Sequence, residues 1–350
     1  MHRVTLQPSG HCFPVPEGKT ILEAGLDAGF SLPYSCRAAV CSTCRALISA
    51  GEVDHGIVFG TLSDDEMARG YTLLCRAMPL SDVVVEVGEL QGLDGVRPRI
   101  LPCRVTSIER AAPDVAILRV RVPNAEGLRF LAGQYVDFLL ENGQRRSFSI
   151  ATKPSREHVT EFDFHIRRVA DGAFTAHVFE TLKPREVLRF EGPLGTFYLR
   201  EDSAKPIIML ASGTGFAPIK AMCESALDAG LFDQRPASIY WGGRTRADLY
   251  MLATALAWKH PNLRFVPVLS EPTAKCEWQG VTGFVHRAVM ADFPDLSGHQ
   301  VYACGVPIMV DSARADFETH CGLPKEQFFA DSFLTQMDRS SHAVTLEQSN

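Results

Sequence analysis

Four of the ten cysteines in this chain are clustered, and their spacing constrains the fold more than any other feature of the sequence. Cys36, Cys41 and Cys44 follow the pattern C-x4-C-x2-C, and Cys75 comes after thirty further residues. Four thiolates grouped in this way can ligate zinc or hold an iron–sulfur cluster. The spacing therefore predicts a metal centre in which one loop supplies three ligands and a distant segment supplies the fourth.

The uneven spacing favours iron–sulfur chemistry over zinc. Structural zinc sites usually use two short cysteine pairs, whereas this sequence has a single C-x2-C. A C-x4-C-x2-C run followed by one distant cysteine is instead the spacing of a plant-type [2Fe–2S] cluster. Zinc and four unrelated core cysteines are the alternatives. The six other cysteines are scattered along the chain, as filler residues would be.

The residues around the four cysteines resemble plant-type ferredoxins. The resemblance covers residues 1–90 and is carried by Pro33–Arg37 and Leu73–Cys75; it implies a β-grasp domain that holds a [2Fe–2S] cluster. Such ferredoxins usually have glycine where this chain has Ala39, and many have glycine where it has Ser42. We expect a steric cost at Ala39 if the loop needs a positive φ there, with cluster ligation retained.

Composition and charge exclude several classes of protein. The 350-residue chain is 46% hydrophobic and 22% charged, which is typical of a globular protein and argues against a disordered or fibrous one. Its length predicts two or three domains. The formal net charge of −6 gives no indication of nucleic-acid binding. No apolar run approaches the roughly 20 residues of a membrane span, and no signal peptide is visible at the start, so we expect a cytoplasmic protein that does not bind membranes.

The hydrophobic pattern changes twice along the chain and predicts three domains. The first is a small α+β domain with a strand hairpin and a helix that starts after Thr20. Short strands with frequent turns then predict an antiparallel β-barrel, and alternating strands and helices predict a parallel α/β sheet. The predicted segments are a ferredoxin domain at 1–92, a linker at 93–99, a flavin barrel at 100–202, a nucleotide domain at 203–335 and a flexible tail at 336–350.

The acidic residues are unevenly distributed among these domains. Residues 1–92 contain six Lys or Arg and eleven Asp or Glu, a formal charge of −5, so this segment carries nearly all of the net charge. Its densest acidic run is Asp64–Glu66, while Arg37 and Arg45 flank the cysteines. The sequence leaves open whether the acidic run lies near the cysteine loop.

One strand of the predicted barrel ends in the pattern R-x-F-S, formed by Arg146, Phe148 and Ser149. An arginine can neutralise a phosphate, an aromatic ring can stack on a flat ligand, and a hydroxyl can hydrogen-bond a ring nitrogen. Strand alternation puts Arg146 and Phe148 on one face and Ser149 on the other. Local twist of the strand must therefore bring all three side chains to the same ligand. Farther on, Gly172 and Thr175 open a helix whose free N–H groups suit a pyrophosphate. An ordinary strand with a solvated arginine is the alternative.

Three turns that follow strands of the last domain predict a dinucleotide site. The turns carry, in chain order, Gly213, Thr214, Gly215 and Pro218; Arg244; and Cys304 with Gly305. Pro218 falls in the first turn of a helix, where its missing N–H costs nothing, and the glycines let the backbone approach a pyrophosphate. All three turns lie at carboxyl ends of strands, where ligands bind in open α/β sheets. A buried Cys304 without a role in binding is the alternative.

Both sets of residues resemble the ferredoxin–NADP reductase superfamily. By that resemblance Arg146 and Thr175 hold the flavin phosphate, Phe148 stacks on the isoalloxazine ring and Ser149 contacts its N5 atom, with Gly172 at the start of the phosphate-binding helix. Phe148 replaces the commoner tyrosine, so a hydroxyl contact on the ribityl side is missing.

The same resemblance assigns the nicotinamide side. The turn of Cys304 and Gly305 lies beside the nicotinamide in such reductases, which makes Ser149 and Cys304 the expected catalytic residues. An aromatic residue near the chain end covers the second flavin face in relatives; Phe333 is the candidate, and a plain core phenylalanine is the alternative. NADH is expected rather than NADPH, although Arg244 could meet a 2′-phosphate. FAD rather than FMN is expected from the domain order.

Taken in order, the three segments resemble single-chain reductases of bacterial oxygenase systems over about residues 1–335. The resemblance implies that hydride passes from NADH to FAD, and that electrons then pass singly through [2Fe–2S] to a partner protein. The expected partner is a Rieske or di-iron oxygenase component that acts on an aromatic compound. A reductase for a deoxysugar (CDP-hexulose) dehydrase, and a non-catalytic iron–sulfur redox sensor, are the alternatives.

Overall fold

A computed structural model describes residues 1–39, 41–58, 61–90, 96, 98–155, 157–170 and 172–333 of the chain, without the side chain of Lys275. The polypeptide divides into two compact units, and the division falls between Gly95 and Val96. The first unit contains the predicted ferredoxin segment. The second contains the predicted barrel and the predicted nucleotide domain.

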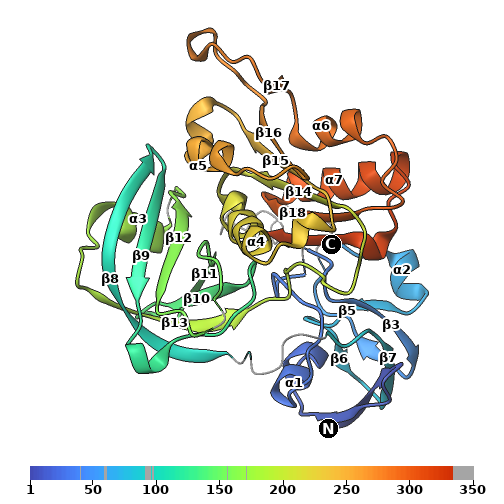
Figure 1. The fold of residues 1–350 in the computed structure, drawn as a ribbon. Helices are drawn as coiled ribbons and strands as arrows, with labels where there is room; N and C mark the ends of the chain where they lie inside the picture. Colours follow the sequence, from blue (N-terminus) through green and yellow to red (C-terminus); the bar gives the residue numbers. More distant parts are fainter. Residues whose placement is uncertain are drawn as a thin grey trace. The chain divides into compact units, whose positions relative to one another are not determined.

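The first unit is a small α+β domain built on one mixed sheet (Figure 1). Its strands lie in the order β2 (Cys12–Val15), β1 (His2–Gln7), β7 (Val83–Glu86), β3 (Arg45–Ala50) and β5 (Tyr71–Leu73). The predicted hairpin is present, since β1 and β2 pair antiparallel. Helix α1 (Ile21–Asp27) begins where the sequence indicates, because Thr20 and Glu23 form a reciprocal capping box.

Several short elements of this unit were not predicted. They are β3, β5, the two-stranded sheet of β4 (Val53–Asp54) and β6 (Met78–Pro79), and helix α2 (Asp64–Ala68). The strands β4, β5 and β6 are two or three residues long, too short for an alternating pattern to be recognised. Helix α2 has no buried residue, so it shows no apolar stripe. Its capping box of Ser63 and Glu66 is its only local signal.

The second unit begins with an antiparallel barrel, as the sequence predicts. The strand order is β11 (Arg145–Ser149), β10 (Tyr135–Leu139), β13 (Val187–Leu194), β8 (Arg99–Ala112), β9 (Val115–Arg121) and β12 (Glu161–Arg167). An antiparallel bridge between Ile150 and Phe164 joins the two ends of this order and closes the barrel. Phe138, Phe162 and Phe190 are among the fully buried residues that fill it. Helix α3 (Ala173–Glu180) follows β12.

Two details of the barrel differ from the sequence-based expectation. Most of the predicted linker lies outside the described residues, and Arg99, which was assigned to it, already pairs with Gly192 in the ladder between β8 and β13. Strand β13 was not predicted, because its sequence VLRFEGPL mixes charges, glycine and proline. Its partner strands supply the hydrogen bonds that the local sequence does not indicate.

The rest of the second unit is a parallel sheet with helices on both faces, which confirms the predicted α/β architecture (Figure 1). The strand order is β17 (Val281–Thr282), β16 (Leu263–Leu269), β15 (Ala237–Gly243), β14 (Ile207–Ser212), β18 (Gln300–Gly305) and β19 (Phe328–Ser332). Helices α4 (Phe216–Asp228) and α5 (Leu252–Ala257) pack in one apolar cluster with one face of the sheet. Helices α6 (Val285–Asp292) and α7 (Pro307–His320) pack in another with the opposite face.

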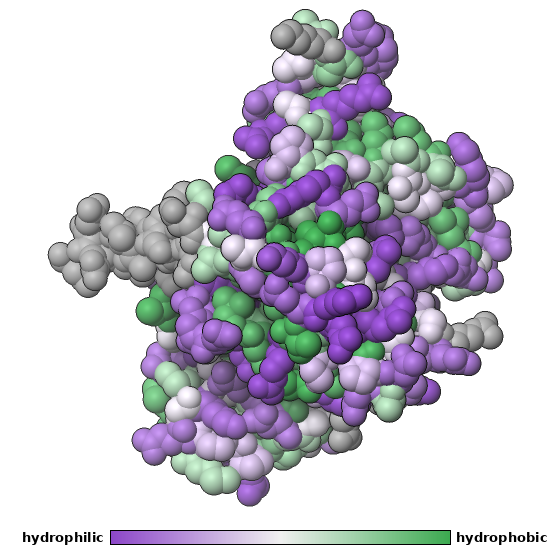
Figure 2. Space-filling view, turned by 90° about the vertical axis from the view of Figure 1, so that its left-hand side faces the viewer, coloured by the Kyte–Doolittle hydropathy of each residue, from purple (hydrophilic) through white to green (hydrophobic). Residues whose placement is uncertain are grey.

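Among the described residues, no helix is both long enough and apolar enough to cross a bilayer. Figure 2 shows hydrophilic and hydrophobic residues interspersed over the face on view.

Candidate functional site

The four clustered cysteines form two pairs in the first unit. Cys36 hydrogen-bonds to Cys41 through its side chain, and Cys44 does the same with Cys75. Within the described ranges, no three His, Cys, Asp or Glu side chains gather around one point as ligands of a single ion. A [2Fe–2S] cluster has two irons and four thiolate ligands, so two pairs fit it better than they fit one tetrahedral zinc.

Backbone amides point at the sulfur atoms of this loop. The N–H of Ala38 donates to Cys36 Sγ over 3.4 Å, and the N–H of Cys36 donates to Cys41 Sγ over 3.5 Å. The amide of Ala39 donates to Cys75. The side-chain hydrogen bond from Cys36 is the main cause that lowers the pKa of Cys41 to about 5. Such donors favour sulfur in its thiolate form, which is the form that binds iron.

The loop takes this shape by adopting left-handed backbone at three non-glycine residues. The φ angles are +52° at Arg37, +59° at Ala39 and +57° at Ser42. The expected steric cost at Ala39 is therefore present, at roughly 1–2 kcal/mol for a residue with a Cβ. Ala39 is buried, and its carbonyl accepts a hydrogen bond of 2.5 Å from Thr61 Oγ1. Contacts from a separate segment thus hold the strained backbone in place.

Helix α2 packs beside β5 and pairs with Arg45, the residue that directly follows the cysteine loop, which places the acidic run near that loop. Arg45, next to Cys44, forms an ion pair of 2.8 Å with Glu66 of α2 and lies 4.0 Å above the ring of Tyr71. Asp64 and Asp65 on the same helix are exposed. The charge of Arg45 is therefore neutralised within the domain, while two carboxylates beside the loop face solvent.

In the barrel, the strand motif and the helix start are brought together. The ring of Phe148 lies 5.4 Å from the ring of Phe174 in α3 and 6.0 Å from that of Phe138. Phe148 remains partly exposed, as does Arg146 two residues earlier. Both therefore keep surface that a ligand could cover, and the predicted alternation of β11 is retained.

Gly172 and Thr175 form a compact helix start. The Thr175 hydroxyl donates to the carbonyl of Gly172 over 3.0 Å and accepts from the N–H of Val169 over 3.2 Å. A Cβ atom at position 172 would lie only 2.6 Å from Thr175 Oγ1. Glycine is thus required for threonine to close this turn in front of α3.

Ser149 has the clearest unsatisfied polar group of the barrel. Its side chain is 5% exposed, and its Oγ atom is buried without a hydrogen-bond partner among the described residues. An unpaired buried hydroxyl costs about 1–3 kcal/mol. A ligand with a ring nitrogen at this point would remove that cost, so the residue fits a flavin-binding role.

In the α/β sheet, the three predicted turns meet at the carboxyl ends of adjacent strands β15, β14 and β18. A Cβ atom at Gly215 would lie 2.2 Å from the carbonyl oxygen of Cys304, and one at Gly305 would lie 2.1 Å from Ser212 Oγ. Trp241 Nε1 donates to the carbonyl of Gly213 over 3.0 Å. The glycines therefore permit backbone contacts that no larger residue would allow. The three turns lie side by side at the edge of the sheet where open α/β folds have their ligand-binding crevice.

The remaining predicted residues lie around this crevice. Thr214 is in the short 3-10 turn after β14, and Pro218 is the third residue of α4. Cys304 is fully buried, and burial raises the pKa of its thiol, so it stays neutral. The N–H of Phe333 donates to the carbonyl of Gly305 over 2.9 Å, which fixes Phe333 beside the same turn. Arg244 is exposed directly after β15.

Arg167 lies beside these turns, although no sequence motif indicated it. Its Nη1 contacts Asp114 Oδ2 at 2.6 Å and Asp248 Oδ1 at 3.0 Å. Its Nη2 is buried without a partner in the described part of the chain, and lies 3.3 Å from the place a Cβ of Gly213 would take. A guanidinium with a free donor beside the glycine turn suits an anionic ligand. Its place on the polar face of β12 was its only sequence signal.

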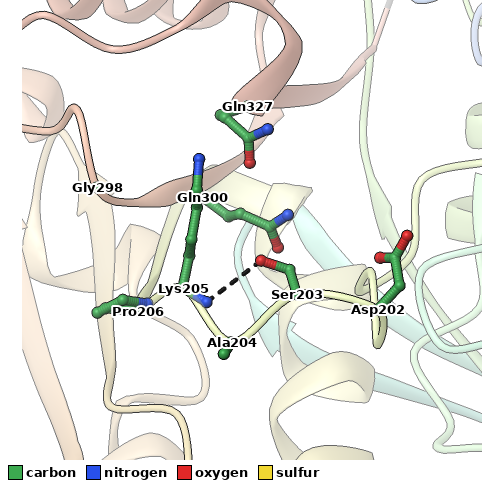
Figure 3. A pocket seen from close by; sticks show the side chains of 8 residues that line it. All are labelled: Asp202, Ser203, Ala204, Lys205, Pro206, Gly298, Gln300 and Gln327. Atoms are coloured by element: carbon green, nitrogen blue, oxygen red, sulfur yellow. Dashed lines mark hydrogen bonds between the residues drawn. The ribbon is translucent and has the colours of Figure 1, made fainter.

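A separate cavity of about 690 Å³ lies at the other end of the parallel sheet (Figure 3). Lys205 and Gln300 line it where β14 and β18 begin, and Gln327 lines it just before β19. Ligands of open α/β sheets bind at the carboxyl ends of the strands. We therefore place the functional site in the crevice of glycine turns and not in this cavity.

Three sequence families match successive parts of the chain. Residues 4–80 match the 2Fe-2S iron-sulfur cluster binding domain. Residues 102–198 match the oxidoreductase FAD-binding domain, and residues 209–315 match the oxidoreductase NAD-binding domain. The matches follow the predicted order of cofactors.

Several curated relatives and a solved structure match nearly the whole chain. A CDP-6-deoxy-L-threo-D-glycero-4-hexulose-3-dehydrase reductase of Yersinia pseudotuberculosis is 42% identical over 95% of this chain and 98% of its own length. The reductase component of a phenol 2-monooxygenase from a Pseudomonas species is 35% identical over 89% of both chains. The crystal structure of the Amycolatopsis cytochrome P450 reductase GcoB superposes with a TM-score of 0.75 at 32% identity, over 95% of this chain and 99% of that one.

Replacing Cys41 by Ser should remove the cluster and spare hydride transfer, because cluster and nucleotide residues lie in separate compact units. The purified variant should reduce ferricyanide with NADH at the wild-type rate but reduce cytochrome c poorly. Cys12→Ser is the matched control, since Cys12 is an exposed cysteine of the same unit. Loss of both activities in the Cys41 variant would contradict the separation of functions.

Replacing Ser149 by Ala should slow flavin reduction by NADH roughly tenfold to a hundredfold, because a hydrogen bond to the flavin worth about 1–3 kcal/mol is lost. Stopped-flow absorbance of the flavin measures this rate. Ser147→Ala is the control on the same strand. Ser147 is exposed, and its hydroxyl already donates to Asp137 over 2.6 Å. An unchanged rate in the Ser149 variant would remove this residue from the site.

Proposed function

We propose an electron acceptor and a set of site residues for this chain, which belongs to the family of single-chain iron–sulfur flavoprotein reductases. The chain is an NAD(P)H-dependent oxidoreductase with [2Fe–2S], FAD and NAD-binding domains. When bound, the flavin accepts two electrons as a hydride from NAD(P)H and can pass them one at a time to the cluster. The presence of both oxidoreductase domains disfavours the alternative of a non-catalytic sensor.

For the cluster and the flavin, we infer the following roles. Cys36, Cys41, Cys44 and Cys75 ligate the cluster, which their two-pair arrangement supports. The residues assigned to flavin are Arg146, Phe148, Ser149, Gly172, Thr175 and Phe333. The buried, unpaired hydroxyl of Ser149 supports this set most directly. We retain the domain boundaries 1–92, 100–202 and 203–335 as part of the proposal.

For the nucleotide, the crevice of turns supplies the binding surface. The residues assigned to it are Gly213, Thr214, Gly215, Pro218, Arg244, Cys304 and Gly305, and we add Arg167. We infer a preference for NADH, because Glu271 lies beside Arg244: its N–H donates to the Arg244 carbonyl over 2.8 Å. An acidic residue near the adenosine ribose accepts hydrogen bonds from the 2′-hydroxyl and repels a 2′-phosphate.

We propose that the acceptor is the oxygenase component of an enzyme system that oxidises an aromatic compound. The observation that carries this proposal is the cysteine loop in the first unit. An iron–sulfur cluster held there would donate electrons one at a time, which suits the metal centres of oxygenases. Relatives named for phenol 2-monooxygenase, terephthalate 1,2-dioxygenase and propane 2-monooxygenase support it. A sugar dehydrase is the second candidate, favoured by the 42% identity to the Yersinia reductase.

The two candidates are separated by supplying each acceptor to the same reductase. With NADH, the chain should reduce the oxygenase component of a phenol 2-monooxygenase faster than a CDP-6-deoxy-hexulose-3-dehydrase, as measured by anaerobic absorbance changes of the acceptor. Cytochrome c serves as an acceptor without specific docking, and NADPH tests the cofactor preference. Faster transfer to the dehydrase would replace the first candidate by the second.

The charge beside the cluster should steer docking. Asp64 and Asp65 are exposed next to the cysteine loop, in a segment of formal charge −5 for residues 1–92. Raising the salt concentration from about 0.05 to 0.3 M should therefore slow electron transfer to the natural acceptor, because charges are screened over roughly 8–10 Å near physiological ionic strength. The rate with ferricyanide and NADH should change less.

A pair of variants localises this effect within the first unit. Asp64→Asn with Asp65→Asn should flatten the salt dependence. The matched control, Glu17→Gln with Asp27→Asn, removes the same charge near α1, which Figure 1 draws apart from α2 within this unit. A rate that is flat or rises with salt in the wild type would mean that apolar contacts govern docking.

A further inference from the structure

Strand β12 of the barrel is buried on both faces at its centre. Phe162, Phe164 and Ile166 point into the barrel core, as the alternating pattern predicts. His165, on the opposite face, is nevertheless only 5% exposed. A polar residue on the outer face of a barrel strand normally faces water, so the α/β half of the second unit must cover it.

The covering residue is Tyr250, which precedes α5. His165 Nδ1 and the Tyr250 hydroxyl lie 2.8 Å apart, and the two rings meet edge to face with centroids 5.4 Å apart. Burial lowers the pKa of His165 to about 3, and burial raises the pKa of Tyr250. Both groups therefore stay neutral at physiological pH, and the hydrogen bond between them is not weakened by salt screening.

The strand register relates His165 to the proposed flavin residue Ser149. The bridge between Ile150 and Phe164 is antiparallel, and the N–H of Ala151 donates to the carbonyl of Asp163 over 2.9 Å. This register places Ser149 directly across from His165 on the same face of the barrel wall.

From Tyr250, the contacts lead to the glycine turn of the nucleotide crevice. Its ring lies edge-on to Trp241, with centroids 5.3 Å apart. Trp241 stacks on Phe216 at 3.7 Å and donates through Nε1 to the carbonyl of Gly213. These contacts therefore lead from His165 to Gly213, and Ser149 stands opposite His165 in the strand register.

We propose that the His165–Tyr250 hydrogen bond is a positioning contact that sets the distance between the flavin held at Ser149 and the nicotinamide held at the glycine turns. The inference rests on the proposed flavin and nicotinamide residues. In the reaction, the C4–H bond of NADH breaks, and the hydrogen moves with both electrons to flavin N5, which leaves NAD⁺. This transfer needs reacting atoms about 3–3.5 Å apart, so a small change in separation strongly affects its rate.

Other contacts between the two halves are less suited to this task. Lys153 pairs with Asp228, but both side chains are about half exposed. Lys220 Nζ donates to the Ala151 carbonyl at a longer 3.3 Å. Arg167 contacts Asp248 as well as Asp114, but is assigned to the nucleotide. The bond between His165 and Tyr250 instead joins two neutral groups, of which His165 is buried and Tyr250 is partly buried.

The test is flavin reduction by saturating NADH in Tyr250→Phe, measured by stopped flow and expressed per bound flavin. Loss of one neutral hydrogen bond should lower the rate constant about three- to tenfold. With NADH deuterated at the transferred position, the isotope effect should also change, because the donor–acceptor distance is altered. A purely structural role would lower the melting temperature or flavin content and leave both of these readouts unchanged.

Tyr240→Phe is the matched control. Tyr240 is a fully buried tyrosine of β15, and its hydroxyl donates to Asp292 Oδ2 over 2.6 Å on the side of α6. This variant should lose stability without a change in the reduction rate per flavin. An equal loss of rate in both tyrosine variants would overturn the proposal.

Variants of His165 complete the test. His165→Asn keeps a polar group near the Nδ1 position and should retain more activity than His165→Leu. The double variant His165→Leu with Tyr250→Phe should be no slower than the slower single variant, because the same bond is lost in each. Rates within twofold of wild type in Tyr250→Phe, or additive losses in the double variant, would refute the positioning role. If NADH failed to reduce the wild-type flavin at all, the proposed function itself would be wrong.

Discussion

A close contact between two backbone turns shapes the carboxyl end of the parallel sheet, where we propose that the nucleotide binds. Gly215 packs on the carbonyl of Cys304, and Gly305 packs on Ser212, at distances that leave no space for a Cβ atom. Because β14 and β18 are adjacent and parallel, these turns lie side by side at the carboxyl end of the sheet, where ligands of open α/β sheets bind. Trp241 and Phe333 each donate a hydrogen bond to one of the two turns, and Arg167 lies close to Gly213.

The two ends of the electron path are built on different physical principles. The nucleotide crevice relies on glycines, which adopt tight backbone conformations at little steric cost. The cysteine loop instead places Arg37, Ala39 and Ser42 in left-handed conformations. Its strain is balanced by amide–sulfur hydrogen bonds and by contacts with the segment that begins at Thr61. This loop thus depends on the fold of its whole domain, and not only on local sequence.

Much of the architecture could be predicted from local patterns. The helix after Thr20, the alternating strand β12 and the strand–turn–helix around Gly213 each have a signal within a few residues. Strands β5 and β13 could not be predicted in this way. The first is three residues long, and the second contains charges, glycine and proline, so each owes its structure to pairing: β5 with β3, and β13 with β8 and β10.

The chemistry of the chain and the order of its parts follow from the amino-acid sequence alone, because ligand spacing and turn composition are local properties. The four cysteines, the R-x-F-S strand and the three turns proposed for the nucleotide are all visible there. Three contacts emerge only when the chain folds: α2 pairs with Arg45 beside the cysteine loop, Arg167 lies near the glycine turn, and His165 is buried against Tyr250. Each of these contacts joins residues at least 21 positions apart, so the pattern of residues around either partner could not reveal it.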